Sequence, residues 1–287
     1  MSDMSDRIVY FNGQILPAED ACLSVFDTGF LHGASVFTTL LVHNGRAFRL
    51  PRHLGRLLGN ARRIGLVHPA TPESLSAGLG ELVAAAGLPE ARVRITLSPG
   101  PVGEQPAPTT LITADPFRND PRWYAEGLDV IINRVLTYRG DLIAGIKTGC
   151  YLTRVLARQA AASVGADEAL WFNTDGQLAE ACFCNVFLVR GGALATPPLD
   201  TPVLPGVVRE AVIELCGQIG IACADDKPLT GADLVAAEEV FLTSSVAGIR
   251  PVVRIDRRPV GDEKPGPVAR KIMAAYAALL DKECPPA

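Results

Sequence analysis

Lys147 stands out as a candidate nucleophile. It is the first lysine of the 287-residue chain, and arginine is the only long cation before it. It lies in "LIAGIKTGCYL", between an apolar run and small residues that begin a predicted helix. A lysine amine attacks a carbonyl only when it is neutral for part of the time, which burial or a neighbouring cation achieves. The segment therefore indicates either a buried reactive amine or an ordinary solvated lysine in an arginine-rich chain.

Two other segments are suited to bind an anion. In "LPGVVRE", Gly206 precedes a predicted helix, so the amides of Val207 and Val208 would point outward at its start. In "LTSSVAG", Thr243, Ser244 and Ser245 offer hydroxyls after a predicted strand. Free amides and the helix dipole favour a phosphate at such places. Taken separately, each segment is also typical of an ordinary helix cap or loop.

A reactive lysine and a phosphate site together suggest pyridoxal 5'-phosphate as a cofactor. That cofactor needs a lysine for a Schiff base, an anion site, a carboxylate at its pyridine nitrogen and a partner for its ring oxygen. The sequence lacks the common alternatives: a phosphate-binding P-loop, a dinucleotide-binding glycine motif, a nucleophile elbow and a zincin helix. The seven cysteines and four histidines lack the spacing of a zinc site, so we expect no metal.

The elements that would position these residues are hairpins and amphipathic helices. Residues 7–17 predict two strands joined by an Asn-Gly turn, and a second Asn-Gly turn at 44–45 joins another pair. Apolar spacing predicts a helix over 52–64 and a second one that begins at Thr71 and ends at Gly87. The remaining predicted elements are strands at 91–98, 109–115 and 127–135, a helix from 150 to about 165, a meander over 168–198, a helix over 206–220, strands with a hairpin over 237–260, and a helix over 266–283.

The order of these elements predicts an α+β protein with much antiparallel sheet. The polar stretch 116–124, with two prolines, is the best boundary. We therefore expect a small domain over residues 1–118 and a larger domain over residues 119–287 that contains Lys147.

Composition narrows the class of protein further. With 48% hydrophobic residues, 20% charged residues and a net charge of −4, the chain can build a core and lacks the basic surface of a nucleic-acid-binding protein. The first residues, "MSDMSDRIVYFNG", have no signal-peptide pattern, and no run of 18 apolar residues occurs. We expect a cytoplasmic protein with reduced cysteines and no membrane partner.

The stretch from Lys147 to Arg209 resembles the core of the class IV aminotransferases, the fold-type IV pyridoxal-phosphate enzymes. The family includes branched-chain aminotransferases, D-amino acid aminotransferases, (R)-amine transaminases and 4-amino-4-deoxychorismate lyases. Its pattern runs lysine, tyrosine, D-E-A-L, E-x-x-x-x-N-[IV]-F, T-P and L-P-G-[IV]-[TV]-R, and this chain has the same order. The N-terminal "DTGFLHGASVFTTLLVHNG" also matches. The resemblance implies a small, sandwich-like α/β domain, a larger domain with a pseudo-barrel of mostly antiparallel strands, and a homodimer.

The resemblance also implies roles for single residues. Lys147 would carry the cofactor as a Schiff base and move a proton between substrate Cα and cofactor C4′. Glu180 would face the pyridine nitrogen, and Tyr151 would hydrogen-bond the ring oxygen. The alternatives are that Glu180 is a charge at a strand edge and that Tyr151 serves packing.

The cofactor phosphate would be bound by Arg56, by the amides of Val207 and Val208, and by the hydroxyls of Ser245 and Ser244. Many relatives have threonine at position 208. Valine lacks that hydroxyl, so we expect only backbone binding there. The alternative for Arg56 is one more solvated arginine on its helix.

The signals for the substrate conflict. Arg92 and Arg94 lie on one face of a predicted strand, and Arg94 resembles the arginine near the carboxylate site of branched-chain enzymes. D-amino acid aminotransferases and deoxychorismate lyases carry another arginine near the position of Glu104. Thr38, in "VFTTL", instead resembles the lyases. Arg94, Arg92 and Thr38 are the candidate substrate-binding residues.

Three functions follow from these observations. The first is a transaminase that exchanges an amino group between an amino acid or amine and a 2-oxo acid by a ping-pong mechanism. The second is a 4-amino-4-deoxychorismate lyase that releases pyruvate and 4-aminobenzoate. The third is a non-catalytic binding protein on the same fold, which the presence of Lys147, Glu180 and Tyr151 disfavours.

Overall fold

The structure is a computed structural model that describes residues 7–101, 103, 107–201 and 203–286. The chain divides into two compact units. The first comprises Met1–Arg118, Ile146–Cys150 and Leu280–Ala287, and the second comprises Asn119–Gly145 and Tyr151–Leu279. The first division falls at the polar stretch that the sequence indicated. The short segment containing Lys147 groups with the first unit, whereas the sequence analysis had placed it in a continuous domain over residues 119–287.

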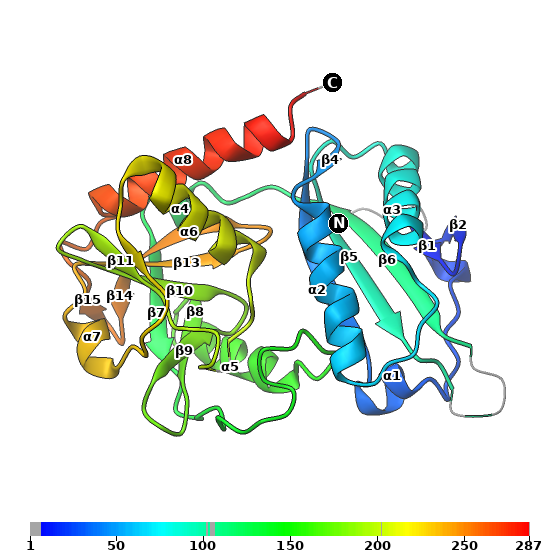
Figure 1. Ribbon diagram of the computed structural model, residues 1–287, viewed down its shortest axis with the longest axis horizontal. Helices are drawn as coiled ribbons and strands as arrows, with labels where there is room; N and C mark the ends of the chain where they lie inside the picture. Colours follow the sequence, from blue (N-terminus) through cyan, green and yellow to red (C-terminus); the bar gives the residue numbers. More distant parts are fainter. Residues whose placement is uncertain (1–6, 102, 104–106, 202, 287) are drawn as a thin grey trace. The chain divides into compact units, whose positions relative to one another are not determined.

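The first unit is built on an antiparallel sheet (Figure 1). From edge to edge, the strands found among the described residues are β2 (Gln14–Pro17), β1 (Ile8–Phe11), β6 (Thr109–Pro116), β5 (Ala91–Ser98), β3 (Val36–His43) and β4 (Arg46–Ala47). The turn between β1 and β2 has Asn12 and Gly13 at positive φ, as the predicted Asn-Gly turn requires. The expected hairpin at residues 7–17 is therefore confirmed.

Two helices cover one face of this sheet, α2 (Leu50–Arg63) and α3 (Pro72–Ala86). Alternate residues of β3 and β5, such as Leu40 and Ile95, pack against apolar residues of both helices. Helix α3 begins and ends as predicted, because Thr71 and Ser74 form a reciprocal capping box and Gly87 takes the left-handed conformation. The short elements of this unit are a 3-10 turn (Ala18–Asp20) and α1 (Thr28–His32).

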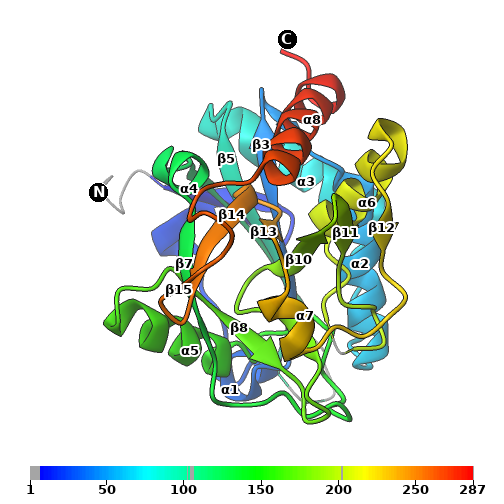
Figure 2. The same cartoon turned by 90° about the vertical axis from the view of Figure 1, so that its left-hand side faces the viewer.

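The second unit contains a curled, half-barrel sheet (Figure 2). Among the described residues, its strand order is β12 (Cys223–Ala224), β11 (Ala193–Ala195), β10 (Asn185–Arg190), β13 (Glu239–Ser244), β14 (Gly248–Ile255), β7 (Leu128–Ile132), β8 (Glu168–Phe172) and β9 (Leu178–Ala181), with β15 (Arg258–Pro259) paired to β14. Leu128, Val186 and Leu242 belong to the core that these strands share. The hairpins β8–β9 and β10–β11 are present as predicted, but β9 and β10 are not neighbours in the sheet, so the single meander predicted over 168–198 is divided into two hairpins.

The sheet departs from the antiparallel pattern at β12, which pairs in parallel with β11, and at β7. β7 runs parallel to both of its neighbours, β8 and β14. A parallel pair needs a crossover connection, and α5 (Leu152–Ser163) lies in the connection from β7 to β8. The other helices are α4 (Arg122–Ala125), α6 (Val207–Ile219), α7 (Gly231–Val235) and α8 (Pro267–Glu283). No helix in the described part of the chain is long and apolar enough to cross a membrane.

Candidate active site

Lys147 is held against the open edge of β3 by main-chain hydrogen bonds. The amide of Phe37 donates to the carbonyl of Lys147 at 2.9 Å, and the amide of Gly149 donates to the carbonyl of Ser35 at 2.8 Å. The Lys147 side chain is buried, with only 9% exposed, and its Nζ lies 4.8 Å from the centre of the Phe37 ring. Lysine is almost never buried without a structural or chemical reason. The structure therefore excludes the solvated surface lysine that the sequence had left open.

The Phe37 ring also carries a second cation. The guanidinium carbon of Arg94 lies 3.5 Å from the centre of the ring, and Arg94 Nε donates to Thr96 Oγ1 at 3.1 Å. These side chains lie on the sheet face opposite α2 and α3, because they alternate with the core residues of β3 and β5. Arg92 is on the same face, but it is exposed and pairs with Asp115 at 3.1 Å. The structure thus brings Arg94, and not Arg92, to the ring that Lys147 contacts.

On the helix-covered face, Thr38 joins His53 and Arg56. Arg56 Nη2 donates to Thr38 Oγ1 at 3.1 Å, and a hydrogen bond of 2.8 Å joins Thr38 Oγ1 to His53 Nδ1. Burial lowers the pKa of His53 well below its ordinary value of 6.5, and the positive charges of Arg56 and Lys147 lower it further. The imidazole is therefore neutral, and two cations lie near it in the first unit. Positive charge concentrated in this way favours an anion.

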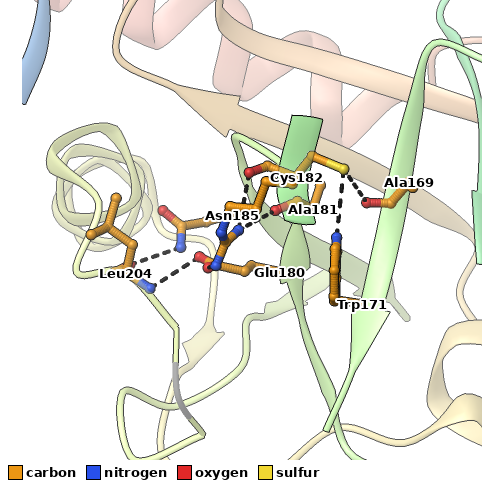
Figure 3. Close-up of polar contacts among 8 residues, drawn as sticks. Ala169, Trp171, Glu180, Ala181, Cys182, Asn185 and Leu204 are labelled. Atoms are coloured by element: carbon orange, nitrogen blue, oxygen red, sulfur yellow. Dashed lines mark hydrogen bonds and ion pairs between the residues drawn. The ribbon is translucent and has the colours of Figure 1, made fainter. Parts of the chain in front are cut away.

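Glu180 is one of three buried carboxylates among the described residues of the second unit, together with Glu168 and Glu239 (Figure 3). It lies on β9, and its two oxygens have separate partners. Arg154 Nη2 donates to Oε1 at 2.5 Å, and the amide of Leu204 donates to Oε2 at 3.0 Å. The alternative of a solvated charge at a strand edge is excluded, since Glu180 is 5% exposed.

Tyr151 lies at the start of α5, one turn before Arg154. Its ring stacks on Phe183, with ring centres 5.8 Å apart and planes at 21°, and the Arg154 guanidinium lies 5.6 Å from the centre of the Tyr151 ring. Within the second unit, Arg154 therefore contacts both Tyr151 and Glu180. Neither contact was anticipated from the sequence.

The start of α6 has the features of an anion site. Gly206 precedes the helix and no side chain caps it, while Val207 and Val208 are buried in the first turn. A Cβ at Gly206 would lie 2.0 Å from Asn185 Oδ1, so only glycine fits there. Asn185 is itself anchored, because its Nδ2 donates to the carbonyl of Leu204 at 2.8 Å. The backbone can therefore approach a ligand closely at this point.

A buried hydroxyl lies beside Asn185 in the sheet. Thr243 pairs directly with Asn185 across β10 and β13, so the two side chains share a face. Thr243 Oγ1 is buried, and no described residue forms a hydrogen bond with it. Of the two predicted serines, Ser244 accepts from the amide of Ala247 at 3.3 Å, and Ser245 lies half-buried in the following turn. Glu104, which affected the choice of substrate, lies outside the described residues.

Sequence reasoning missed three polar residues of these clusters: His53, Arg154 and Asn185. Two of them had a local signal. His53 precedes Arg56 by three residues on a predicted helix, and Arg154 follows Tyr151 by three, spacings that place side chains on one face. Asn185 belongs to the E-x-x-x-x-N-[IV]-F pattern but had been given no role. Thr243 belongs to the "LTSSVAG" segment that the sequence suggested for anion binding, but only strand pairing brings it to Asn185.

Comparison with known proteins identifies the family. Residues 35–255 match the family described as amino-transferase class IV. The chain belongs to the class IV aminotransferases. It is 32% identical to a putative branched-chain-amino-acid aminotransferase of Methanocaldococcus jannaschii, over 96% of each chain.

Solved structures of class IV aminotransferases share this fold. The branched-chain aminotransferase of Escherichia coli matches with a TM-score of 0.91 at 26% identity, covering 96% of this chain and 95% of the other. The branched-chain aminotransferase of Thermoproteus uzoniensis, solved with norvaline, matches with a TM-score of 0.88 at 30% identity, covering 96% and 95%. A putative 4-amino-4-deoxychorismate lyase of Legionella pneumophila matches less well, with a TM-score of 0.81 at 25% identity, covering 91% and 95%.

Proposed function

We propose that this class IV aminotransferase uses pyridoxal 5'-phosphate to exchange an amino group between an amino acid and a 2-oxo acid in a ping-pong reaction. The observation that carries the proposal is the buried amine of Lys147, fixed to β3 and packed on the Phe37 ring. A buried amine next to other cations is suited to attack a carbonyl carbon.

The residues present fit this cofactor on two independent observations. The glycine before α6, where a Cβ would meet Asn185 at 2.0 Å, leaves backbone amides open to a phosphate. The buried Thr243 hydroxyl beside Asn185 lacks a partner among the described residues, as expected where a ligand is normally bound. We assign phosphate binding to Arg56, the amides of Val207 and Val208, and the hydroxyls of Ser244 and Ser245.

When bound, pyridoxal phosphate supplies an electron sink that stabilises negative charge on the substrate Cα. Lys147 would attach the cofactor and move the proton at the substrate Cα. Glu180 would face the ring nitrogen and hold a proton there, since a buried carboxylate stabilises the protonated nitrogen. Tyr151, stacked on Phe183, would donate to the ring oxygen.

The proposed amino donor is a branched-chain amino acid. The support is the match to relatives that are described as branched-chain aminotransferases, together with Arg94, whose guanidinium suits a carboxylate. Arg92 is a weaker candidate, because it is engaged with Asp115. Thr38 lies on the opposite sheet face from Arg94 and accepts from Arg56, which favours a role in holding Arg56 over contact with substrate.

We further propose that the protein is a homodimer. Leu152, Val155 and Leu156 lie at i, i+3 and i+4 on α5, and they are 70%, 38% and 52% exposed. An exposed apolar helix face of this kind is typical of a surface that another chain covers.

The attachment of the cofactor can be tested directly. We expect borohydride reduction of the purified protein, followed by peptide mapping, to place a stable pyridoxyl group on Lys147. The Lys147→Ala variant should lose this modification, and Lys264→Ala, which alters an exposed lysine, should keep it. A reduced group on another residue, or on none, would refute the proposal.

The same protein can be used to separate transaminase from lyase. Leucine, isoleucine or valine added to the holoenzyme should convert the bound cofactor to its amine form, which absorbs at shorter wavelength, and release the matching 2-oxo acid. A protein that releases pyruvate from aminodeoxychorismate, and gives no such half-reaction with any amino acid or amine, would be the lyase instead.

A further inference from the structure

Arg154 connects several parts of the second unit around Glu180. Its Nη2 donates to Glu180 Oε1 at 2.5 Å, and its Nη1 donates to the carbonyls of Ala181 and Cys182 at 3.1 and 3.0 Å. The guanidinium also lies 5.6 Å from the centre of the Tyr151 ring. Arg154 therefore contacts both Glu180 and Tyr151, two residues assigned to the cofactor, although Arg154 itself has been assigned no role.

The charge of this pair is set by burial and by close contact. Burial acts to lower the pKa of Arg154, but the Glu180 carboxylate, together with smaller contributions from Tyr151 and Cys182, outweighs it, so the pKa of the guanidinium lies above its ordinary value. Glu180 is buried, and a buried carboxylate stays ionised only where charged or polar donors surround it. Arg154 and the amide of Leu204 are those donors.

Glu180 retains the capacity to bind one more group. An ionised carboxylate has about four acceptor positions on its two oxygens. One donor on each oxygen leaves positions for the ring nitrogen of a cofactor. A proton shared between that nitrogen and Glu180 can then lie on either partner. Surroundings that stabilise the negative charge of the carboxylate keep the proton on the ring nitrogen.

We propose that Arg154 is a positioning residue that keeps Glu180 ionised, so that the shared proton stays on the cofactor ring nitrogen. The inference rests on the proposed function, since it concerns the ring nitrogen of pyridoxal phosphate. An Arg154 cation next to Oε1 favours the state with a carboxylate and a protonated ring over the state with a neutral acid and a neutral ring. The proton moves between Glu180 and the ring nitrogen, and no other reactant takes part.

The contact to Glu180 is separable from the structural contacts of Arg154. Nη1 binds the carbonyls of Ala181, the last residue of β9, and of Cys182, and Nη2 binds the carboxylate. A neutral side chain removes the charge at Glu180, whereas lysine restores the charge without the forked geometry. The side chain of Arg158, one turn further along α5, forms no hydrogen bond or ion pair with any other described residue, so Arg158 provides the matched control.

The test measures the protonation of the ring nitrogen in the holoenzyme. Wild type, Arg154→Gln, Arg154→Lys and Arg158→Gln are loaded with cofactor labelled with ¹⁵N in the ring, and the ¹⁵N chemical shift is recorded at neutral pH. We expect the protonated-ring shift in wild type and in Arg158→Gln. In Arg154→Gln the proton equilibrium should move toward Glu180 by about tenfold, the lower end of the effect of a nearby opposite charge. Arg154→Lys should recover most of the protonated signal.

Each outcome bears on one hypothesis. A ring-nitrogen shift in Arg154→Gln equal to that of wild type would overturn the inference while leaving the proposed function intact. Absence of borohydride-trapped cofactor on Lys147 in wild type would overturn the proposed function first. Thermal melts show whether each variant is folded. If Arg154→Gln does not fold, Arg154→Met, which keeps an apolar stem of similar length, serves as the second neutral variant. A lower kcat with little change in KM for the amino donor accompanies the expected shift, because the ring is then a poorer electron sink.

Discussion

His53 is held neutral inside the first unit by burial and by two neighbouring positive charges. Its Nδ1 is hydrogen-bonded to Thr38, which also accepts from Arg56, so the imidazole supports the arginine assigned to the cofactor phosphate. A neutral ring suits this place, because a third positive charge beside Arg56 and Lys147 would be repelled.

This histidine makes stability depend on pH in a defined direction. Its pKa in the folded protein lies well below 6.5, so below pH 6.5 the unfolded chain binds a proton that the folded protein does not. We expect the free energy of unfolding to fall as pH drops below 6.5, by up to about 1.4 kcal/mol per pH unit from His53. Urea unfolding of wild type and His53→Gln across this range measures it, because the difference between the two removes the other titrating groups. Parallel pH profiles would contradict the prediction.

The start of α6 combines a glycine, an anchored asparagine and an uncapped first turn. None of these features alone indicates an anion site, since many helices begin after glycine. Gly206 packs closely against the side chain of Asn185, the first residue of β10, so the start of the helix is in contact with this strand. A change at either residue therefore affects the helix start and the strand together.

Two glycines of this region allow a matched comparison. Gly206→Ala places a Cβ 2.0 Å from Asn185 Oδ1, so we expect a loss of about 1–3 kcal/mol in the free energy of unfolding and weaker cofactor binding. Gly217→Ala, inside the same helix with open space around its Cβ position, should stabilise by about 0.5–1 kcal/mol. Urea unfolding and cofactor titration measure both effects. Adding Asn185→Ala to Gly206→Ala should relieve the overlap, and no recovery of stability would show that the cause lies elsewhere.

The exposed apolar face of α5, formed by Leu152, Val155 and Leu156, is the surface proposed to join two subunits. Leu152 follows Tyr151 directly in the chain, and Leu156 lies one turn further along the helix. A partner that covered these leucines would also shield the start of the helix from water. Burial of this face, rather than its charge, would then hold the subunits together.

A charge on this face should weaken a homodimer. We expect wild type to have twice the monomer mass in light scattering, and Leu156→Glu to weaken association by about tenfold or more, because it places a carboxylate in an apolar contact. Val235→Glu, at an 82% exposed position on α7, is the control and should leave the mass unchanged. A monomeric wild type, or a dimer indifferent to Leu156→Glu, would contradict the proposal.

Local patterns were enough to predict the elements whose cause lies within a few residues. The Asn-Gly turn after β1, the capping box of Thr71 and Ser74, and the left-handed Gly87 depend on hydrogen bonds and backbone angles of neighbouring residues. The family could also be predicted from the sequence, because the order of motifs from Lys147 to Arg209 can be seen without knowing how the chain folds.

Contacts across long chain separations could not be predicted in this way. Arg154 meets Glu180 across 26 residues, Thr243 meets Asn185 across two strands, and the segment of Lys147 returns to the edge of β3 more than a hundred residues upstream. The helix between β7 and β8 was predicted, but the parallel pairing of β7 with β14 depends on strands far apart in the chain. Such contacts depend on how strands pair and pack, so residue types and their order indicated the chemistry, whereas long-range packing set the partner and the charge of each group.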